Sequence, residues 1–337
     1  MSKRVLIVGA GGFIGGHIAR EGLNRGYEVW AAVRKSTSRR YLDDPRLNFL
    51  VLDYDDVEAM RQAISDAMPE GERWDYIIYN LGATKCINFS AFNLINHDYL
   101  KRFLDVITEL DKIPERFLYM SSLSALGVGD EKNYEPFTAR SIPMPNTAYG
   151  VSKINAEIEL TTRAAIPYTI FRATGVYGPH EQDYLMMIKC IDRHFDFGVG
   201  YRKQVLTFIY VDDLVNAMFD AVESPDTVKK KYIISEDRSY TQKEFREIVA
   251  RLLGKKWVIP IKLPLWMARL ASTVAEKWGA IRMRPSTLNR DKYKIMRQRN
   301  WNCDVTEAKT DFNFNPRFSL EEGLKATIEA YKAEKKR

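Results

Sequence analysis

The sequence predicts an α/β fold in which a doubly wound parallel sheet carries a smaller mixed α/β lobe. Three observations predict it. Short apolar, β-branched runs alternate with helical patterns in the first half of the chain, a glycine-rich turn follows the first run, and the alternation weakens after about residue 178. Such alternation forms βαβ units with right-handed crossovers. We expect one domain over residues 1–178 and a smaller lobe over 179–337, with some later segments returning to the first domain.

The elements follow from their residue patterns. Strands are expected where apolar β-branched or aromatic residues run together, at 5–8, 28–33, 48–52, 74–80, 116–120 and 168–171. Helices are expected where apolar residues recur with helical period, at 12–24, 57–67, 94–110, 148–165 and 320–332. Between them, residues 204–253 mix short strands and helices without a clear period.

Composition excludes several classes of protein. The 337 residues are 45% hydrophobic and 28% charged, which is typical of a soluble globular chain. No uncharged apolar stretch reaches the roughly 18 residues of a membrane span, and the first apolar run is too short for a signal peptide. We therefore expect a cytoplasmic protein without a transmembrane segment. Three separated cysteines and four histidines without ligand spacing predict no metal site.

Positive charge is concentrated late in the chain. The net charge is +7, yet residues 255–299 hold twelve basic and two acidic residues. This segment favours an anionic ligand, a membrane surface or nucleic acid, and a solvated basic face explains it equally well. Within it, Trp266, Leu270, Val274 and Trp278 recur every four residues, which predicts a helix packed on the core.

The glycine-rich turn indicates a dinucleotide site. Gly9, Gly12 and Gly15 follow the first strand, and Phe13 and Ile14 open the helix. The first glycine permits the tight turn, the second lets the backbone approach a pyrophosphate, and the third lets helix and sheet pack closely. The helix N-terminus supplies unpaired N–H groups for phosphate. We expect a Rossmann-type dinucleotide-binding domain.

The next strand ends suggest which dinucleotide binds. After the second strand comes Arg34, where NAD sites generally carry an acid, so we expect NADP to be preferred over NAD. Asp53, followed by Tyr54, could accept a hydrogen bond from the adenine amino group, although a turn-forming aspartate fits as well. Leu81, Gly82 and Ala83 follow the fourth strand, where small residues would let the backbone lie along the cofactor.

The candidate catalytic residues are Tyr149 and Lys153. They form a YxxxK pattern, as do Tyr331 and Lys335, but only Tyr149 begins a helix after the loop that follows the fifth strand. Four residues place both side chains on one helical face, where an ammonium would lower the pKa of the phenol toward neutrality. A hydroxyl must orient the substrate oxygen, and we favour Ser122 over Ser124.

These residues resemble the extended short-chain dehydrogenase/reductase family, also called the NAD-dependent epimerase/dehydratase family. The resemblance rests on the glycine turn, Asp53 and four segments: 117–122, 145–153, 171–179 and 208–214. It implies Ser122, Tyr149 and Lys153 as a catalytic triad and Asn96 as a support for the active-site helix near the cofactor. Leu123 and Ser124 stand where nucleotide-sugar dehydratases carry an Asp-Glu pair, which argues against 4,6-dehydration.

We therefore expect an enzyme that moves a hydride between nicotinamide C4 and a carbinol or carbonyl carbon. The basic segment favours an anionic small molecule, specifically a nucleotide sugar, and thus an epimerase or dehydrogenase. The alternative is an NADPH-dependent reductase of the dihydroflavonol-reductase or hydroxysteroid-dehydrogenase type, with Trp266, Met267, Leu270 and Trp278 lining an apolar pocket. A non-catalytic NADP(H) sensor is a third hypothesis. No nucleic-acid binding is expected, and a homodimer through two helices of the first domain is common in relatives.

Overall fold

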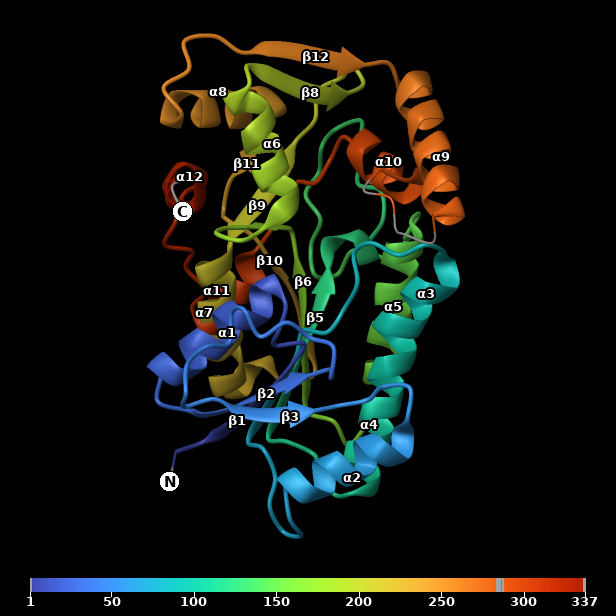
Figure 1. Cartoon of the computed structure of the whole chain (residues 1–337), viewed down its shortest axis with the longest axis vertical. Coiled ribbons are helices and arrows are strands. Elements are labelled where there is room, and N and C mark those ends of the chain that lie inside the picture. Colours follow the sequence, from blue (N-terminus) through green and yellow to red (C-terminus); the bar gives the residue numbers. More distant parts are fainter. Residues whose placement is uncertain (1, 283–285, 287, 336–337) are drawn as a thin grey trace.

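A seven-stranded parallel sheet organises the larger part of the molecule (Figure 1). The computed structural model describes residues 2–282, 286 and 288–335. The sheet has the order β10-β6-β5-β4-β1-β2-β3. Its strands, in chain order, are β1 (Arg4–Val8), β2 (Glu28–Val33), β3 (Asn48–Val51), β4 (Tyr76–Tyr79), β5 (Arg116–Ser122), β6 (Tyr168–Ala173) and β10 (Lys230–Ile234).

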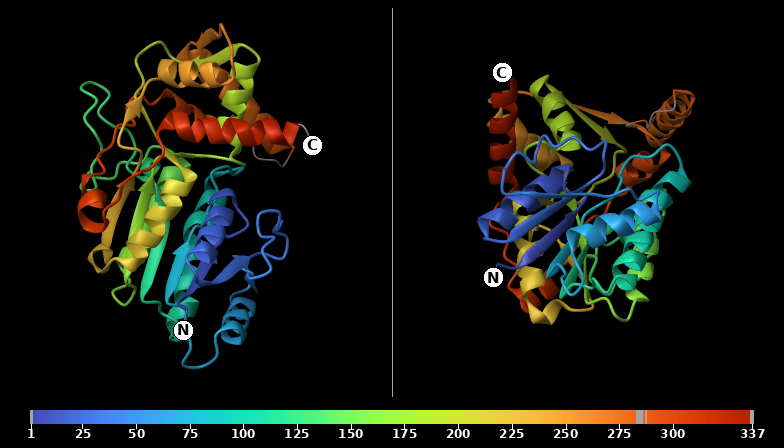
Figure 2. Two further views of the ribbon diagram at one scale, coloured as in Figure 1. Left: turned by 90° about the vertical axis from the view of Figure 1, so that its left-hand side faces the viewer. Right: turned by 60° about the horizontal axis from the view of Figure 1, so that its bottom comes forward.

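Helices cover both faces of this sheet (Figure 2). Alternate residues of β1 point to opposite faces, so that Val5 and Ile7 join one core while Leu6 and Val8 join the other. The first face is covered by α1 (Phe13–Asn24), α7 (Val211–Glu223) and α11 (Thr306–Phe312). The second is covered by α2 (Val57–Ala67), α4 (Tyr99–Glu109) and α5 (Ala148–Thr161).

Short elements complete the larger part. α3 (Phe89–Asn93) continues into a π-helical turn at Leu94–Asp98 before α4 begins. Single 3-10 turns follow β5, at Leu123–Ala125, and α7, at Pro225–Thr227. The expected helix over 94–110 therefore starts as a π turn, which rotates Asn96 into the interior.

A smaller lobe stands above the carboxyl ends of the strands (Figure 1). It contains two small sheets, β11-β9-β7 and β12-β8. Their strands are β7 (Gly175–Tyr177), β8 (Phe195–Val199), β9 (Leu206–Tyr210), β11 (Ser239–Tyr240) and β12 (Ile259–Leu263). The helices of this lobe are α6 (Gln182–Asp192), α8 (Gln242–Leu252), α9 (Leu265–Ile281), α10 (Arg290–Arg297) and α12 (Leu320–Lys335).

The structure confirms the predicted fold class. A parallel sheet covered on both faces carries a smaller mixed lobe, and β10, α7 and α11 are later segments that pack with the first sheet. In the part of the chain that the structure describes, no helix is long and apolar enough to cross a membrane.

One expected packing is wrong. The stripe of Trp266, Leu270, Val274 and Trp278 does not pack on the core, because all four side chains of α9 are exposed. The opposite side of this helix, with Ala268 and Ser272, is the buried one. Small residues therefore make the contact between α9 and the rest of the lobe, and the large apolar ones face outward.

Candidate active site

A cavity of about 1190 Å³ lies between the sheet and the smaller lobe. One wall comes from the residues at the carboxyl ends of β1, β2, β4, β5 and β6, and the other from α6, β8, β9 and α10. β1 has β2 on one side and β4 on the other, so the strand order reverses at β1. Ligands of open α/β sheets bind in the crevice at such a reversal. The fold thus places the cavity where a cofactor is expected.

The glycine turn forms one end of the cavity. Gly9 has a φ of +86°, and a Cβ there would lie 2.8 Å from the backbone of Leu81. A Cβ on Gly15 would lie 2.3 Å from the carbonyl oxygen of Gly9, so only glycine allows α1 to start this close to β1. Gly12 is the N-cap of α1 and carries no side-chain cap, which leaves the first N–H groups of Phe13 and Ile14 open to an anion.

Arg34 lines the same end of the cavity, next to Tyr54. Tyr54 is buried and stacks on Tyr99, with ring centroids 5.2 Å apart. Asp53 does not line the cavity, and its carboxylate accepts a hydrogen bond from the Asp55 N–H at 3.0 Å. The cavity is therefore lined by the guanidinium of Arg34 after β2 and by the ring of Tyr54 after β3. Asp53 stabilises the turn after β3 instead of lining the cavity.

Asn96 lies behind the cavity wall and supports it through hydrogen bonds. It is fully buried, and its side chain bonds the Ala83 N–H at 2.7 Å, the Ala83 carbonyl at 3.1 Å and the Ser152 hydroxyl at 2.9 Å. The amide thereby ties the loop after β4 to α5. Leu81 and Gly82 line the cavity, whereas Ala83 and Asn96 do not. A Cβ on Gly82 would lie 3.1 Å from both Asn96 Oδ1 and Lys153 Nζ.

Tyr149 and Ser122 meet on the cavity wall. Tyr149 is in the first turn of α5, which Thr147 caps by accepting a hydrogen bond from the Gly150 N–H at 2.9 Å. Burial raises the pKa of Tyr149, and its side-chain hydrogen bond with Ser122 opposes that rise. Ser122 ends β5, and its hydroxyl also accepts a hydrogen bond from the Ser124 N–H at 3.2 Å. Of the two serines, Ser122 is thus the one bonded to the phenol.

Lys153 is buried one turn further along α5. Its ammonium donates to the Met120 carbonyl at 2.7 Å and to the Tyr119 hydroxyl at 3.3 Å. Burial lowers the pKa of Lys153 to about 7, although the charge of Glu157 raises it. We expected Lys153 to lower the pKa of Tyr149. In the structure burial outweighs any such effect, and Lys153 itself carries only part of its charge at neutral pH.

A buried ion pair fixes α5 to the sheet. Glu157 accepts hydrogen bonds from Ser121 at 2.6 Å and from Arg172 at 3.0 and 2.7 Å. Ser121 is on β5 and Arg172 on β6, so one carboxylate holds α5 against two neighbouring strands. Sequence reasoning did not assign this role. The signal was present, because Glu157 follows Lys153 by four residues and is on the same helical face.

The half of the cavity under the smaller lobe combines apolar with polar and charged lining residues. Its apolar lining residues are Met186, Met187, Cys190, Phe197, Val199, Leu206, Phe208, Ile295, Met296 and Trp301. Two lysines line this half, and both are ion-paired with Asp183: Lys85 at 2.6 Å and Lys292 at 2.9 Å. The basic segment 255–299 contributes no basic lining residue other than Lys292 among those the structure describes.

The structure brings together most of the expected site residues. Those that line the cavity are Gly9, Gly12, Phe13, Ile14, Arg34, Tyr54, Leu81, Gly82, Ser122, Ser124, Tyr149 and Lys153. Trp266, Met267, Leu270 and Trp278, considered above for an apolar pocket, do not line it. Within the described ranges, no group of three or more His, Cys, Asp or Glu side chains is arranged to hold a metal ion.

Known proteins share this architecture and sequence pattern. UDP-glucose 4-epimerase of Vibrio cholerae is 22% identical over 98% of this chain and 96% of its own length. The ceramide reductase of Caulobacter vibrioides is 23% identical over 98% of this chain and 94% of its own. The structure of UDP-glucose 4-epimerase with UDP-glucose from Thermotoga maritima is similar with a TM-score of 0.76 and 21% identity, covering 98% of this chain and 99% of that one.

A family model provides the firmer assignment. The model of the NAD dependent epimerase/dehydratase family matches residues 5–235, which include the glycine turn, Ser122, Tyr149, Lys153 and all seven strands of the large sheet up to Ile234. Its description is that of NAD-dependent enzymes, and in this chain the cavity lies between the large sheet and the smaller lobe. The protein therefore belongs to the NAD dependent epimerase/dehydratase family of extended short-chain dehydrogenases/reductases.

Proposed function

We propose that the protein is an NADP(H)-dependent oxidoreductase that reduces the carbonyl group of a neutral, mostly apolar substrate to an alcohol. The observation that carries the proposal is the meeting of Tyr149, Ser122 and Lys153 on the wall of a cavity whose other half has a large apolar component but no arginine among the described lining residues. The glycine turn and the uncapped start of α1 fit the pyrophosphate of a nicotinamide dinucleotide. When bound, that cofactor supplies the hydride.

The chain's own residues supply the proton. A raised pKa keeps the Tyr149 phenol protonated at neutral pH, which is the form that donates to a carbonyl oxygen during reduction. Ser122, already bonded to the phenol, orients the same oxygen. Lys153 has a pKa of about 7 and can return a proton to Tyr149 or stabilise its phenolate at physiological pH. Asn96 and Glu157 are positioning residues, since they act through Ala83, Ser152, Ser121 and Arg172.

Arg34 supports NADP(H) as the preferred cofactor. It lines the cavity directly after β2, where a guanidinium matches the charge and geometry of a 2′-phosphate. Asp53, the acid expected to bind adenine, instead bonds the backbone of its own turn. Among the described residues, Arg34 is also the only arginine that lines the cavity.

Electrostatics in the substrate half support a neutral substrate. Four acids line that half, Glu181, Asp183, Asp196 and Asp291, against the two lysines that Asp183 already pairs. A nucleotide sugar would bring a diphosphate into this net negative environment without an arginine to bind it. The ceramide reductase of Caulobacter supports the same reading, because its name assigns a reductase of a lipid to a relative that matches this chain over almost its full length.

The second candidate is a nucleotide-sugar epimerase or dehydrogenase. It is supported by the relatives named for UDP-glucose, which match equally long stretches of this chain. It uses the same three residues: Tyr149 would accept the hydroxyl proton of the carbinol, a bound nicotinamide cofactor would supply the hydride acceptor, and the oxidised intermediate would remain bound. The two candidates differ in net cofactor consumption: a reductase consumes NADPH, whereas an epimerase inverts a stereocentre without net consumption.

One experiment separates these candidates. Thermal shifts with NADP, NAD and UDP-sugars identify ligands that bind the native protein, and NADPH oxidation is then followed with a panel of apolar ketones. We expect NADPH oxidation with apolar ketones and no stabilisation by UDP-sugars. Tyr149→Phe is expected to lower turnover by about a hundredfold or more while leaving NADPH affinity unchanged. Turnover retained by Tyr149→Phe would refute the proton-transfer assignment.

A further inference from the structure

An exposed apolar stripe runs along α9. The fractional exposures are 67% for Trp266, 59% for Leu270, 58% for Val274, 56% for Trp278 and 77% for Ile281. Successive members are three or four residues apart, so they lie on one side of the helix. Single exposed apolar side chains are normal on a protein surface, but a contiguous stripe of large ones marks an interaction surface.

The apolar surface continues onto the neighbouring ribbon of β8 and β12. Phe195, Phe197, Trp257 and Ile259 are exposed there, and Ile259 pairs with Phe195 in the ribbon. Tyr201 follows β8 and is exposed next to the start of α9, where Leu265 packs close to Gly200. Figure 1 shows β8, β12 and α9 at the same end of the molecule, opposite the amino-terminal end of the large sheet.

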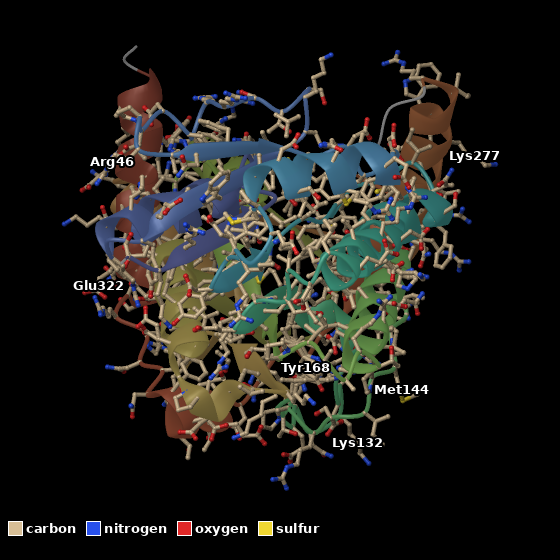
Figure 3. All side chains as sticks on the ribbon, turned by 90° about the horizontal axis from the view of Figure 1, so that it is seen from below. Arg46, Lys132, Met144, Tyr168, Lys277 and Glu322 are labelled. Carbon is tan, nitrogen blue, oxygen red and sulfur yellow. The ribbon has the colours of Figure 1, made fainter. Side chains whose placement is uncertain are left out.

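Basic side chains accompany this surface. Lys256, Lys262, Arg269, Lys277 and Arg282 are exposed, and among the described residues no acidic side chain forms a salt bridge with any of them. Glu276, the one acid of α9, is paired with Arg290 at 2.8 Å. In Figure 3, Lys277 lies on α9 at one margin of the molecule, away from Glu322 on α12. The stripe therefore has basic side chains beside and within it that no acidic side chain of the described residues neutralises by a salt bridge.

The same surface adjoins the cavity. Phe197 and Met186, the latter on α6, are each half exposed, and each also lines the cavity. On its inner side, α9 packs through Ala268 against Val199, another cavity-lining residue. Phe197 and Met186 thus belong both to the outer surface and to the lining of the substrate half of the cavity.

We propose that α9, with the β8–β12 ribbon, docks this protein on the surface of an anionic lipid bilayer. A helix with large apolar residues, tryptophans near both ends and flanking Lys and Arg lies in the plane of a membrane interface, with its apolar side among the acyl chains. Each basic residue near an anionic surface strengthens the attachment. Nucleic acid would leave the apolar stripe in water, and a second copy of the chain would bring like charges together.

Docking gives the cavity access to lipid. If the proposed reductase activity holds, the substrate class is a membrane lipid with a carbonyl group, which enters past Phe197 and Met186 without crossing water. This part depends on the proposed function, whereas membrane binding does not. The two can therefore fail separately.

Vesicle flotation tests the docking. The full chain is mixed with vesicles of phosphatidylcholine alone or of phosphatidylcholine with phosphatidylglycerol. We expect binding to the anionic vesicles that weakens as salt is added, and little binding to the neutral ones. Trp266→Ser with Trp278→Ser, and separately Arg269→Glu with Lys277→Glu, are each expected to weaken the partition coefficient by about tenfold or more.

Matched controls change equivalent residues elsewhere. Ile142→Ser with Met144→Ser removes two exposed apolar side chains from a loop, and Lys132→Glu with Lys325→Glu reverses the same amount of charge away from α9. Both controls should bind vesicles like the parent. All variants should keep the parent's unfolding transition and its turnover of a short, water-soluble ketone.

Three results would overturn the docking proposal. The first is equal vesicle binding by the α9 variants and the parent. The second is a dimer, seen by light scattering, that the α9 variants convert to a monomer while the parent does not bind vesicles. The third is salt-sensitive retention on duplex DNA that the tryptophan substitutions leave unchanged, with no flotation on anionic vesicles.

Discussion

Lys153 gives a prediction whose size follows from its environment. The Lys153 residue is 4% exposed, and burial lowers the pKa of its amine from 10.5 to about 7. In the unfolded chain it returns to its ordinary pKa, so between pH 7 and 10.5 the unfolded state binds the extra proton. The cost of burying the amine is fully present below pH 7 and is relieved as the pH rises toward 10.5.

Replacing Lys153 with methionine removes this cost, because methionine keeps an unbranched side chain of similar length but has no ionisable group. At pH 7 a shift of this size corresponds to a penalty of about 4 kcal/mol, and at pH 9 the remainder is about 2 kcal/mol. Loss of the hydrogen bond to the Met120 carbonyl offsets roughly 1 kcal/mol of the gain at either pH. We therefore expect the ligand-free Lys153→Met protein to be the more stable one at pH 7.

Urea unfolding of both proteins from pH 7 to pH 9 measures the effect. Every other titrating group is common to the two proteins, so its contribution cancels in the difference between their unfolding free energies. We expect that difference to shrink by about 2 kcal/mol over this interval. A difference independent of pH would show that Lys153 does not titrate in this range and would refute the proton-return role proposed for it.

Three further predictions test other parts of the site. Arg34→Ala should weaken NADP(H) binding by roughly thirtyfold, about 2 kcal/mol, and NAD(H) binding much less, and equal losses in calorimetric titrations would contradict the selectivity argument. Ser122→Ala should lower kcat by at least about tenfold while Ser124→Ala changes it little, because only Ser122 bonds Tyr149; the reverse order in steady-state kinetics would reassign the hydroxyl. Asn96→Ala leaves the partly buried N–H of Ala83 without its partner and should cost about 2 kcal/mol of unfolding free energy. A loss within the roughly 0.5 kcal/mol of ordinary surface changes would argue against the tie between this loop and α5.

The sequence was informative where the chemistry is local. The turn at Gly9 and Gly15 could be predicted from the sequence, because Gly9 has a positive φ and Gly15 lies against the backbone of Gly9. Both constraints require glycine and act within a few residues. The spacing of Tyr149 and Lys153 is legible for the same reason, since one helical turn joins them. The parallel sheet follows from the alternation of strands and helices.

What the sequence did not reveal depends on contacts between distant segments. Asp183 pairs with Lys85 and Lys292, which are 98 and 109 residues away, and no local pattern shows that these lysines are already neutralised. The buried side of α9 could not be predicted either, because a stripe of large apolar residues normally marks the buried side of a helix. Here the small residues Ala268 and Ser272 fill that side instead.

The position of β10 has a consequence for exchanging parts between relatives. β10 pairs with β6 at the edge of the large sheet, although the chain reaches it only after building much of the smaller lobe. A fragment that stops at residue 178 would leave β6 as a bare edge and would uncover Phe171, which otherwise packs on Tyr232 and Phe312. A chimera that joins the smaller lobe of a relative to the large sheet of this protein must therefore be spliced at more than one junction. It must retain residues 211–235 and 305–314 from the parent.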